Sequence, residues 1–183
     1  MRVRFIQKSL CKIVWTNFFF FSTCIIFTNF LSNGRKTVKF KKGRNFGMVN
    51  NAQMVLTNYY NALGSKKIDR VIEIVHDEAK FIILKKEPSK KIPLYGTYEG
   101  KEGVKKYLNI LEEAYQIDMF IINKIIGDQD TAFAWGSFRI KVRVTGKTFE
   151  SDWAVVCEVE KEKIKLFQFF EDTAALEEAF DLT

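Results

Sequence analysis

The last third of the chain alternates apolar and polar residues over four consecutive runs. The runs cover about residues 117–126, 131–144, 148–159 and 163–170, and the connections GDQD, TGK and EKE separate them. Successive side chains of a strand point to opposite faces, so this period of two predicts strands with one buried face. Because short polar turns join antiparallel neighbours, the four runs predict an antiparallel meander.

Three helical patterns precede this meander. Apolar residues recur every three or four positions over 52–63, 68–75 and 104–115, which places them on one face of a helix. The segment AKFIIL at 79–84 predicts a strand before the third helix, and a short final helix is expected after Asp172. This order predicts an α+β fold in which helices cover one face of a curved sheet.

The positive charge of the chain is concentrated in residues 1–47. The formal net charge is +7, from 29 basic and 22 acidic residues, but residues 1–47 hold ten basic residues and no acidic one. Residues 48–183 therefore keep 19 basic against 22 acidic residues, a net charge of −3. A nucleic-acid-binding domain needs a basic face of its own, so we expect no nucleic-acid partner. The chain divides into a basic segment, 1–47, and a domain, 48–183.

Residues 13–31, IVWTNFFFFSTCIIFTNFL, carry no charge and are about long enough to cross a bilayer. Three interpretations are open: a membrane anchor, a cleaved signal peptide, or a start codon assigned too far upstream, with Met48 as the true start. Four positive charges precede the span and six follow it, a pattern that keeps the following domain in the cytoplasm. We therefore expect a cytoplasmic domain, either free or membrane-anchored and facing the cytoplasm.

The sequence offers little for a metal or cofactor. Its three cysteines, Cys11, Cys24 and Cys157, form no CxxC pair, and His76 is the single histidine. No glycine-rich phosphate loop is present. We expect no metal, nucleotide or flavin cofactor.

Three segments resemble the ketosteroid isomerase-like family, also called nuclear transport factor 2-like (NTF2-like) or SnoaL-like. They are YYNALGSKKIDRVIEIVHDEAKF, YEGKEGVKKYL and KIKLFQFFEDTAALEEAF, and the resemblance covers residues 52–180. It implies a conical α+β barrel, with three N-terminal helices packed on a curved antiparallel sheet around an apolar pocket, often in a homodimer. It does not imply one function, because the fold hosts isomerases, cyclases, dehydratases and non-catalytic binding modules.

The resemblance also bears on catalysis. The family's isomerase uses a tyrosine, an aspartate base and a protonated aspartate. The match places Tyr59 at the tyrosine, but Ile83 at the base and Val155 at the second aspartate. Without a titratable base a proton shuttle cannot run, so steroid-type isomerisation by that mechanism is disfavoured.

Strand alternation and the same match predict which side chains face the pocket. Residues two apart share a sheet face, so the predicted lining is mostly aromatic and aliphatic: Ile83, Ser151, Trp153, Val155, Phe167 and Phe169. Tyr59 and Glu171 are the candidate catalytic groups, although Trp153 and the phenylalanines also suit an ordinary core. Asp172 is predicted to cap the final helix.

The run 131–144 has two sets of side chains, one for each face of the predicted sheet. On the run 131–144, residues Phe138, Ile140, Val142 and Val144 form a fully apolar set. Arg139 belongs to the opposite set, where it would either bind an anionic ligand at a pocket rim or form part of a solvated face.

Two hypotheses of function remain open. One is an isomerase, cyclase or dehydratase in which Glu171 is the acid or base and Tyr59 donates a hydrogen bond; a carboxyl group buried among phenylalanines would have a raised pKa. The other is a non-catalytic module that binds a small molecule or a protein. We expect a SnoaL-like protein that binds a small hydrophobic or polyketide-like molecule.

Overall fold

The computed structural model describes residues 26–29, 36–40 and 51–182. The helices are α1 (Asn51–Gly64), α2 (Ile68–Ile74), α3 (Gly100–Ala114) and α4 (Thr173–Ala179). The strands are β1 (Ile26–Asn29), β2 (Lys36–Phe40), β3 (Val75–Ile83), β4 (Gly96–Glu99), β5 (Tyr115–Gly127), β6 (Thr131–Val142), β7 (Thr148–Glu160) and β8 (Lys163–Glu171). Apart from β1, the apolar span 13–31 lies outside the described residues. Among the helices that the structure describes, none is long and apolar enough to cross a membrane.

The strands form one sheet in the order β1-β2-β5-β6-β7-β8-β3-β4. The predicted meander is confirmed, since β5, β6, β7 and β8 pair with their sequence neighbours in antiparallel fashion. Two pairs are parallel, β3 with β8 and β2 with β5. The parallel pairing of β3 and β8 places a strand from the first half of the domain beside the last one.

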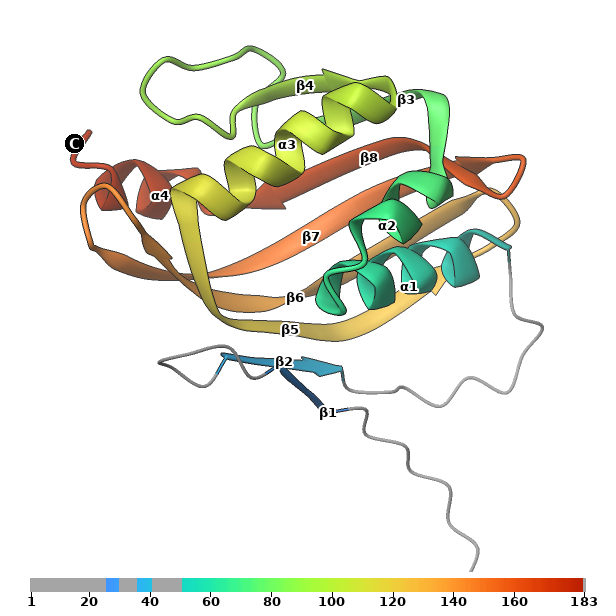
Figure 1. Ribbon diagram of the computed structural model, residues 1–183, viewed down its shortest axis with the longest axis horizontal. Helices are drawn as coiled ribbons and strands as arrows, with labels where there is room; N and C mark the ends of the chain where they lie inside the picture. Colours follow the sequence, from blue (N-terminus) through green and yellow to red (C-terminus); the bar gives the residue numbers. More distant parts are fainter. Residues whose placement is uncertain (1–25, 30–35, 41–50, 183) are drawn as a thin grey trace, which may run out of the picture.

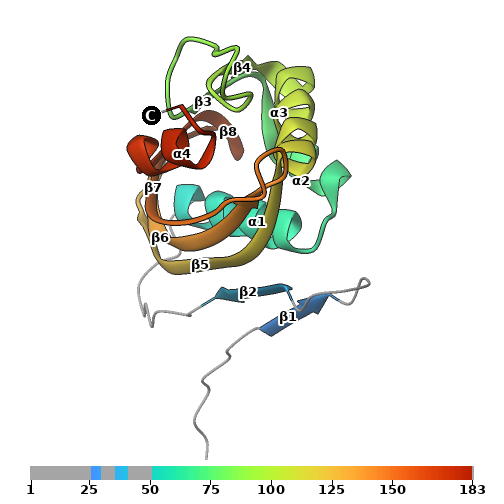
Figure 2. The same cartoon turned by 90° about the vertical axis from the view of Figure 1, so that its left-hand side faces the viewer.

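The sheet curves around the helices (Figures 1 and 2). Helix α1 packs on β5, β6 and β7, helix α3 packs on β3 and β4, and α4 lies against β7. The predicted α+β cone, with three N-terminal helices on a curved sheet, is confirmed. Its interior lies between the concave face of the sheet and α1 and α3.

The alternation of β6 and β7 divides the sheet into two faces. Every second residue of each strand is buried toward the helices, and the residues between them are mostly exposed. The buried set of the two strands includes Phe138, Ile140, Val142, Trp153 and Val155. Burying side chains of this size contributes about 1.5–3 kcal/mol each, which makes this face the main stabilising surface.

Gly136 marks the tightest contact of the sheet. The register of β5 on β6 shifts between Ile122 and Lys124, which indicates a bulge. A Cβ atom on Gly136 would lie 1.8 Å from the backbone oxygen of Ile121 and 2.9 Å from Cζ2 of Trp153. The same Ile121 oxygen accepts a hydrogen bond from Nε1 of Trp153 at 3.2 Å. A residue without a side chain is therefore required at position 136.

Several predicted boundaries were wrong. The second helix ends at Ile74, and β3 begins at Val75 rather than at residue 79; an irregularity between Val75 and Lys80 interrupts the alternation there. Tyr115 was assigned to a helical stripe but is the first residue of β5. The short strands β1, β2 and β4 were missed, because four or five residues are too few to establish a period.

Val144 is a further correction. It does not continue the buried set of Phe138, Ile140 and Val142, because β6 ends at Val142 and the chain turns. Its side chain is 80% exposed.

We predict that Gly136→Ala lowers the free energy of unfolding by about 3 kcal/mol or more, because the added methyl group meets backbone that cannot move without breaking the bulge. Urea denaturation followed by circular dichroism measures this. Ser137→Ala, on the opposite face of the same strand, is the control and should stay within about 0.5 kcal/mol of the wild type. A Gly136→Ala protein as stable as this control would contradict the contact.

Candidate functional site

All six tyrosines of the chain are buried in the domain interior. Their exposed fractions run from 0% for Tyr59 to 8% for Tyr98. They come from α1, from the segment leading into β4, from β4 itself, from α3 and from the start of β5: Tyr59, Tyr60, Tyr95, Tyr98, Tyr107 and Tyr115. A buried phenol normally has a hydrogen-bond partner, so the contacts of these six hydroxyl groups indicate what the interior is built for.

Three of the six hydroxyl groups have no hydrogen-bond partner among the residues that the structure describes. Tyr98 donates to the backbone oxygens of Pro93 and Leu94 at 3.1 and 3.2 Å. By contrast, the buried hydroxyl groups of Tyr59, Tyr60 and Tyr115 make no hydrogen bond within the described part of the chain. An unsatisfied buried hydroxyl costs about 1–3 kcal/mol. The interior thus holds three hydroxyl groups that have no hydrogen-bond partner among the described residues.

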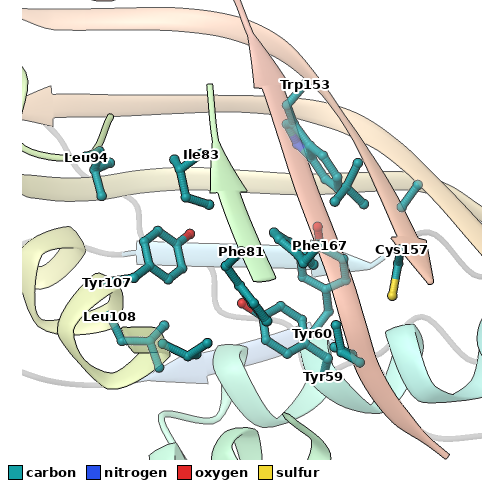
Figure 3. Close-up of a cluster of buried hydrophobic side chains, with 14 of the residues drawn as sticks. Tyr59, Tyr60, Phe81, Ile83, Leu94, Tyr107, Leu108, Trp153, Cys157 and Phe167 are labelled. Carbon is teal, nitrogen blue, oxygen red and sulfur yellow. The ribbon is translucent and has the colours of Figure 1, made fainter. Parts of the chain in front are cut away.

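The predicted pocket residue Phe167 lies in a cluster of aromatic rings next to Tyr59 (Figure 3). Its ring stacks on Phe81 with 4.7 Å between centroids and lies 5.2 Å from the ring of Tyr59. At the edge of this cluster, burial raises the pKa of the Cys157 thiol to about 12, which disfavours the reactive thiolate.

Trp153 and Phe169, also predicted to line the pocket, belong to the adjoining part of the interior. The ring of Trp153 lies 4.8 Å from Phe120, 5.6 Å from Tyr60 and 5.7 Å from Phe169. Trp153 is 3% exposed, whereas Phe169 is partly buried. The ring of Tyr60 therefore packs near Trp153, whereas the ring of Tyr59 packs near Phe167.

Glu171, the candidate acid, is the last residue of β8 and lies on the inner side of the strand. Its carboxyl group makes no hydrogen bond or ion pair with the residues that the structure describes. Burial, and to a smaller extent the neighbouring Asp172, raises the pKa of Glu171 to about 8. At pH 7 this carboxyl group is mostly protonated and is therefore a hydrogen-bond donor.

The charge of Glu171 is the second largest cause of the raised pKa of two phenols, Tyr107 and Tyr115. Burial raises the pKa of both far above the ordinary value, and the charge of Glu171 is the next cause in each case. For Tyr59 the causes are burial, then Tyr107, Tyr60 and Cys157, and its hydroxyl makes no hydrogen bond. The structure thus does not join the two predicted catalytic groups, Glu171 and Tyr59. Tyr107 is the electrostatic neighbour that they share.

Ser151, Val155 and Ile83 lie where the alternation predicted, on the inner face. Ile83 and Val155 flank Phe169 from the two neighbouring strands, and both are almost fully buried. The hydroxyl group of Ser151 accepts a hydrogen bond from the backbone nitrogen of Asp172 at 3.0 Å and donates to the Asp152 carbonyl at 2.6 Å. Ser151 therefore fixes the chain immediately after Glu171.

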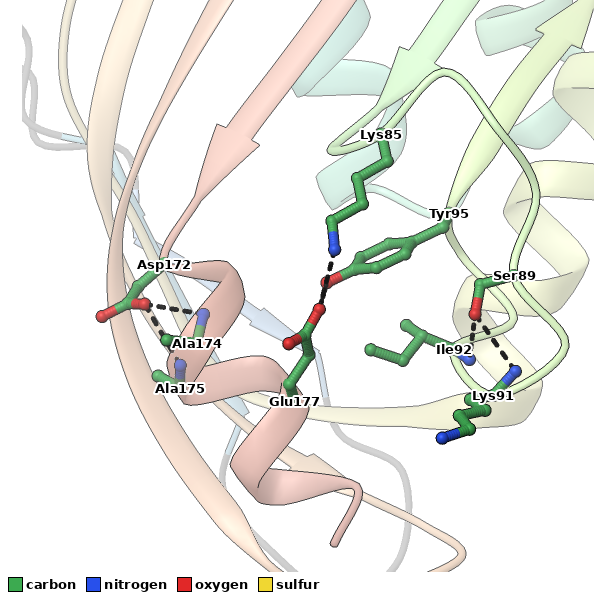
Figure 4. A network of polar contacts seen from close by, with 9 residues as sticks. All are labelled: Lys85, Ser89, Lys91, Ile92, Tyr95, Asp172, Ala174, Ala175 and Glu177. Atoms are coloured by element: carbon green, nitrogen blue, oxygen red, sulfur yellow. Dashed lines mark hydrogen bonds and ion pairs between the residues drawn. The ribbon is translucent and has the colours of Figure 1, made fainter. Parts of the chain in front are cut away.

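Helix α4 begins at a cap, as predicted. Asp172 accepts hydrogen bonds from the backbone nitrogens of Ala174 at 3.0 Å and Ala175 at 3.1 Å (Figure 4). Such a cap stabilises a helix by about 1 kcal/mol. The adjacent carboxylates of Glu171 and Asp172 therefore have different surroundings, the first inside the domain and the second at a helix end.

A polar network that the sequence did not indicate ties the loop 84–95 to α4 (Figure 4). Lys85 pairs with Glu177 at 2.8 Å and lies 4.8 Å from the ring centre of Tyr95, whose hydroxyl group donates to Glu177 at 3.3 Å. The hydrogen bond from Lys85 holds the pKa of Glu177 below its usual value. Burial, then Glu177 and to the smallest extent the charge of Glu171 raise the pKa of Tyr95, so this network borders the candidate site.

A surface groove of about 420 Å³ lies beside Tyr115. Its lining comes from α3, the turn after β6 and the ends of the loop and of α4: Pro93, Ile110, Glu113, Ala114, Arg143, Val144 and Phe180. The ring of Phe180 also packs edge-on against Tyr115, 6.0 Å between centroids. Phe180 thus both lines the groove and contacts the ring of Tyr115.

Other predicted features have simpler surroundings. Arg139 lies on the exposed face of β6 and donates from Nε to Glu150 at 2.6 Å, as expected of a solvated face. Within the described ranges no three His, Cys, Asp or Glu side chains group closely enough to hold a metal ion.

Comparisons with known proteins agree with the fold. A family model described as the SnoaL-like domain matches residues 56–167. An NTF2-like protein from Burkholderia xenovorans is similar in structure, with a TM-score of 0.63, 22% identity, and coverage of 73% of this chain and 99% of that one. TerC, co-crystallised with polyporic acid, has a TM-score of 0.60, 16% identity, and coverage of 72% and 99%.

One curated relative matches over a shorter stretch. Patulin synthesis protein F from Aspergillus clavatus is 42% identical over 62 residues, which are 33% of this chain and 31% of that protein. The match thus spans about a third of the relative's length.

We predict that Glu171 makes the domain less stable as the pH rises from about 4.5 to 8. The unfolded carboxyl group loses its proton near pH 4.3, whereas the folded one keeps it up to about pH 8, so the native state binds more protons in this window. Glu171→Gln should therefore be more stable than the wild type at pH 8.5, by roughly 2 kcal/mol, and similar to it at pH 4.

Thermal unfolding between pH 4 and 9 tests this, with the exposed carboxylate variant Glu158→Gln as the matched control. Parallel pH profiles for Glu171→Gln and wild type would show that the carboxyl group is not buried as described.

Proposed function

Because the chain belongs to the SnoaL-like domain family, we propose that it binds a small hydrophobic or polyketide-like molecule in its tyrosine-lined interior. In this proposal Ile83, Trp153, Val155, Phe167 and Phe169 supply the apolar lining, and Ser151 holds the end of β8 in place. Small-molecule sites usually combine such a lining with a few placed polar groups.

The observation that carries the proposal is the set of unpartnered phenols of Tyr59, Tyr60 and Tyr115. Phenylalanine would fill the same space without leaving a buried donor unsatisfied, so the hydroxyl groups lower the stability of the unliganded domain. A molecule whose carbonyl or hydroxyl oxygens accept from these phenols would recover that energy. TerC, which shares the fold, was crystallised with polyporic acid, and this supports an oxygen-rich aromatic molecule as the first probe.

We predict that Tyr59→Phe and Tyr60→Phe each raise the stability of the unliganded protein by about 1 kcal/mol and weaken probe binding about tenfold. The physical reason is the same for both effects: the variant lacks a donor that is unsatisfied without ligand and satisfied with it. Thermal unfolding measures the first effect. Calorimetric titration with polyporic acid, and with p-terphenyl as its hydrocarbon counterpart, measures the second.

Tyr98→Phe is the matched control, because its hydroxyl group is already satisfied by Pro93 and Leu94. It should lose stability and leave probe affinity unchanged. The proposal fails if Tyr59→Phe and Tyr60→Phe behave like Tyr98→Phe, or if p-terphenyl binds as tightly as polyporic acid.

A second candidate function is acid–base catalysis by Glu171. It is favoured by one observation, the buried carboxyl group with a pKa of about 8, near the operating pH of a general acid or base. In this proposal Glu171 exchanges a proton with carbon next to a carbonyl group, and a phenol donates a hydrogen bond to the oxygen. The sequence indicates Tyr59 for that donor, whereas the electrostatic neighbours of Glu171 are Tyr107 and Tyr115. A module without catalysis, binding a small molecule or a protein, is the contrasting proposal.

We predict that the protein, if catalytic, accelerates exchange of the hydrogen atoms next to the carbonyl of 1-tetralone with deuterium from D₂O. Glu171→Gln should remove at least 99% of the acceleration, because the amide cannot take up or release the proton. Proton NMR measures the exchange rate. No acceleration by the wild type, or full acceleration by Glu171→Gln, would leave the binding module as the function.

We also propose that the domain acts in the cytoplasm, as a homodimer, either free or tethered through residues 13–31. The charge pattern around that span and the family resemblance support this proposal.

A further inference from the structure

The surface groove at one end of the domain differs from the tyrosine-lined interior in its lining and in its charge. It lies where the end of α3, the turn after β6 and the end of α4 come together (Figures 1 and 2). Its volume of about 420 Å³ is in the range of small-molecule sites. Most of its lining residues are apolar: Pro93, Ile110, Ala114, Val144 and Phe180. The other two are Glu113 and Arg143, and we call the whole the Arg143 groove.

Hydrogen bonds join the walls of this groove. The hydroxyl group of Thr145, in the turn after β6, donates to the carbonyl oxygen of Ala179 in α4 at 2.8 Å. On the other side of the turn, the backbone nitrogen of Arg143 donates to the carbonyl oxygen of Ala114, the last residue of α3, at 2.9 Å. The walls are thus held together without a ligand, so the groove is pre-formed, as small-molecule sites usually are.

The side chain of Arg143 is fixed at one end and open at the other. Its Nε donates to the carbonyl oxygens of Glu112 at 3.2 Å and Tyr115 at 3.1 Å, which orients the guanidinium group. Its two Nη atoms make no hydrogen bond or ion pair with the residues that the structure describes. Because a guanidinium group binds a carboxylate through two parallel hydrogen bonds, the groove presents an oriented anion-binding group beside an apolar surface.

We propose that the Arg143 groove binds a small apolar molecule that carries one carboxylate group. In this proposal the carboxylate oxygens accept hydrogen bonds from the two Nη atoms of Arg143. The apolar body of the molecule covers Val144 and Phe180. Val144 is 80% exposed, so a ligand at this position removes apolar surface from water that the fold itself leaves uncovered.

The charges of the lining favour a single carboxylate over a phosphate or a cation. Arg143 is the one basic residue of the lining and Glu113 the one acidic residue, so a phosphate dianion would meet a single cation and a repelling carboxylate. Three hydrogen bonds from its backbone nitrogen and Nε hold Arg143 in place. Glu113 is exposed and has no hydrogen bond or ion pair of its side chain within the described ranges, so its carboxylate can turn into water.

This inference does not rest on the proposed function of the interior. The lining of the Arg143 groove includes none of the residues assigned to the interior site. Variants of the groove should therefore leave the binding of polyporic acid to the interior unchanged, and Tyr60→Phe should leave the groove unchanged.

Calorimetric titration of the full chain with three probes of the same shape tests the proposal. The probes are 1-naphthaleneacetate, the uncharged 1-naphthaleneacetamide and the cation 1-naphthalenemethylammonium. We expect the acetate to bind about tenfold more tightly than either of the others, because hydrogen bonds between two charged groups are stronger than those of a neutral amide. Nuclear magnetic resonance of the ¹⁵N-labelled chain should show shifted amide signals for Ala114 and Val144, and unshifted ones for Tyr59 and Tyr60.

Two changes at Val144 isolate the charge without touching Arg143. Val144→Asp should weaken binding of the acetate about tenfold relative to Val144→Asn, since the two side chains have the same shape and only the first repels an anion. The position is exposed, so we expect both variants to fold.

Arg143→Gln should bind the acetate and the acetamide equally, because it lacks the cation. Arg139→Gln is the matched control, in which a half-exposed arginine outside the groove is replaced, and it should keep the preference for the acetate. Circular dichroism checks that both arginine variants are folded, and the pair at Val144 decides the question if Arg143→Gln is not.

The proposal is overturned if the acetamide binds as tightly as the acetate, or if Val144→Asp and Val144→Asn bind the acetate equally. Tighter binding of the ammonium probe would assign the groove to cations through Glu113 instead. Shifted signals for Tyr59 and Tyr60, with none for Val144, would place the probe in the interior and also overturn the proposal.

Discussion

The close approach of the Ile121 carbonyl to Gly136 is the contact on which the shape of the sheet depends. It brings β5 against β6 at a distance that no side chain permits, and the indole Nε1 of Trp153 donates a hydrogen bond to the same Ile121 carbonyl. Bulges bend strands and increase their twist. Because β5 and β6 bend here, the inner face can enclose α1, and residues from β5, β7, α1 and α3 converge on one interior.

Much of the fold could be predicted from the sequence because its signals are local. The alternation of β6 and β7 placed Ser151, Trp153 and Val155 on the inner face, and Asp172 in front of α4 indicated the cap. The signals weaken where an element is short or irregular. Four residues of β4 carry no measurable period, and the irregularity after Val75 hid the first half of β3.

The candidate site was less predictable, because its contacts join residues that are distant in sequence. Alternation indicated that Glu171 turns inward, but not that Tyr107 and Tyr115 would be its neighbours, since that depends on how α3 and β5 meet the end of β8. Lys85 and Glu177 are 92 residues apart, and nothing in the lysine-rich loop distinguished Lys85 from its neighbours. The phenols that have no partner within the described ranges could not be predicted either, because the sequence does not show which hydroxyl groups lie within hydrogen-bond distance of an acceptor.

Each face of the sheet carries side chains that its surroundings do not favour: polar groups on the buried face and large apolar groups on the exposed face. Inside, three tyrosine hydroxyls stand where phenylalanine would be more stable; outside, Trp135, Phe133 and Phe170 stand where polar residues would be more soluble. Proteins keep such departures mainly where function requires them. The fold itself needs neither, because the inner methyl and ring packing already stabilises the cone. The hydroxyl groups inside therefore favour a role of the interior beyond stabilising the fold, and the proposed binding of an oxygen-bearing molecule is one that would use them.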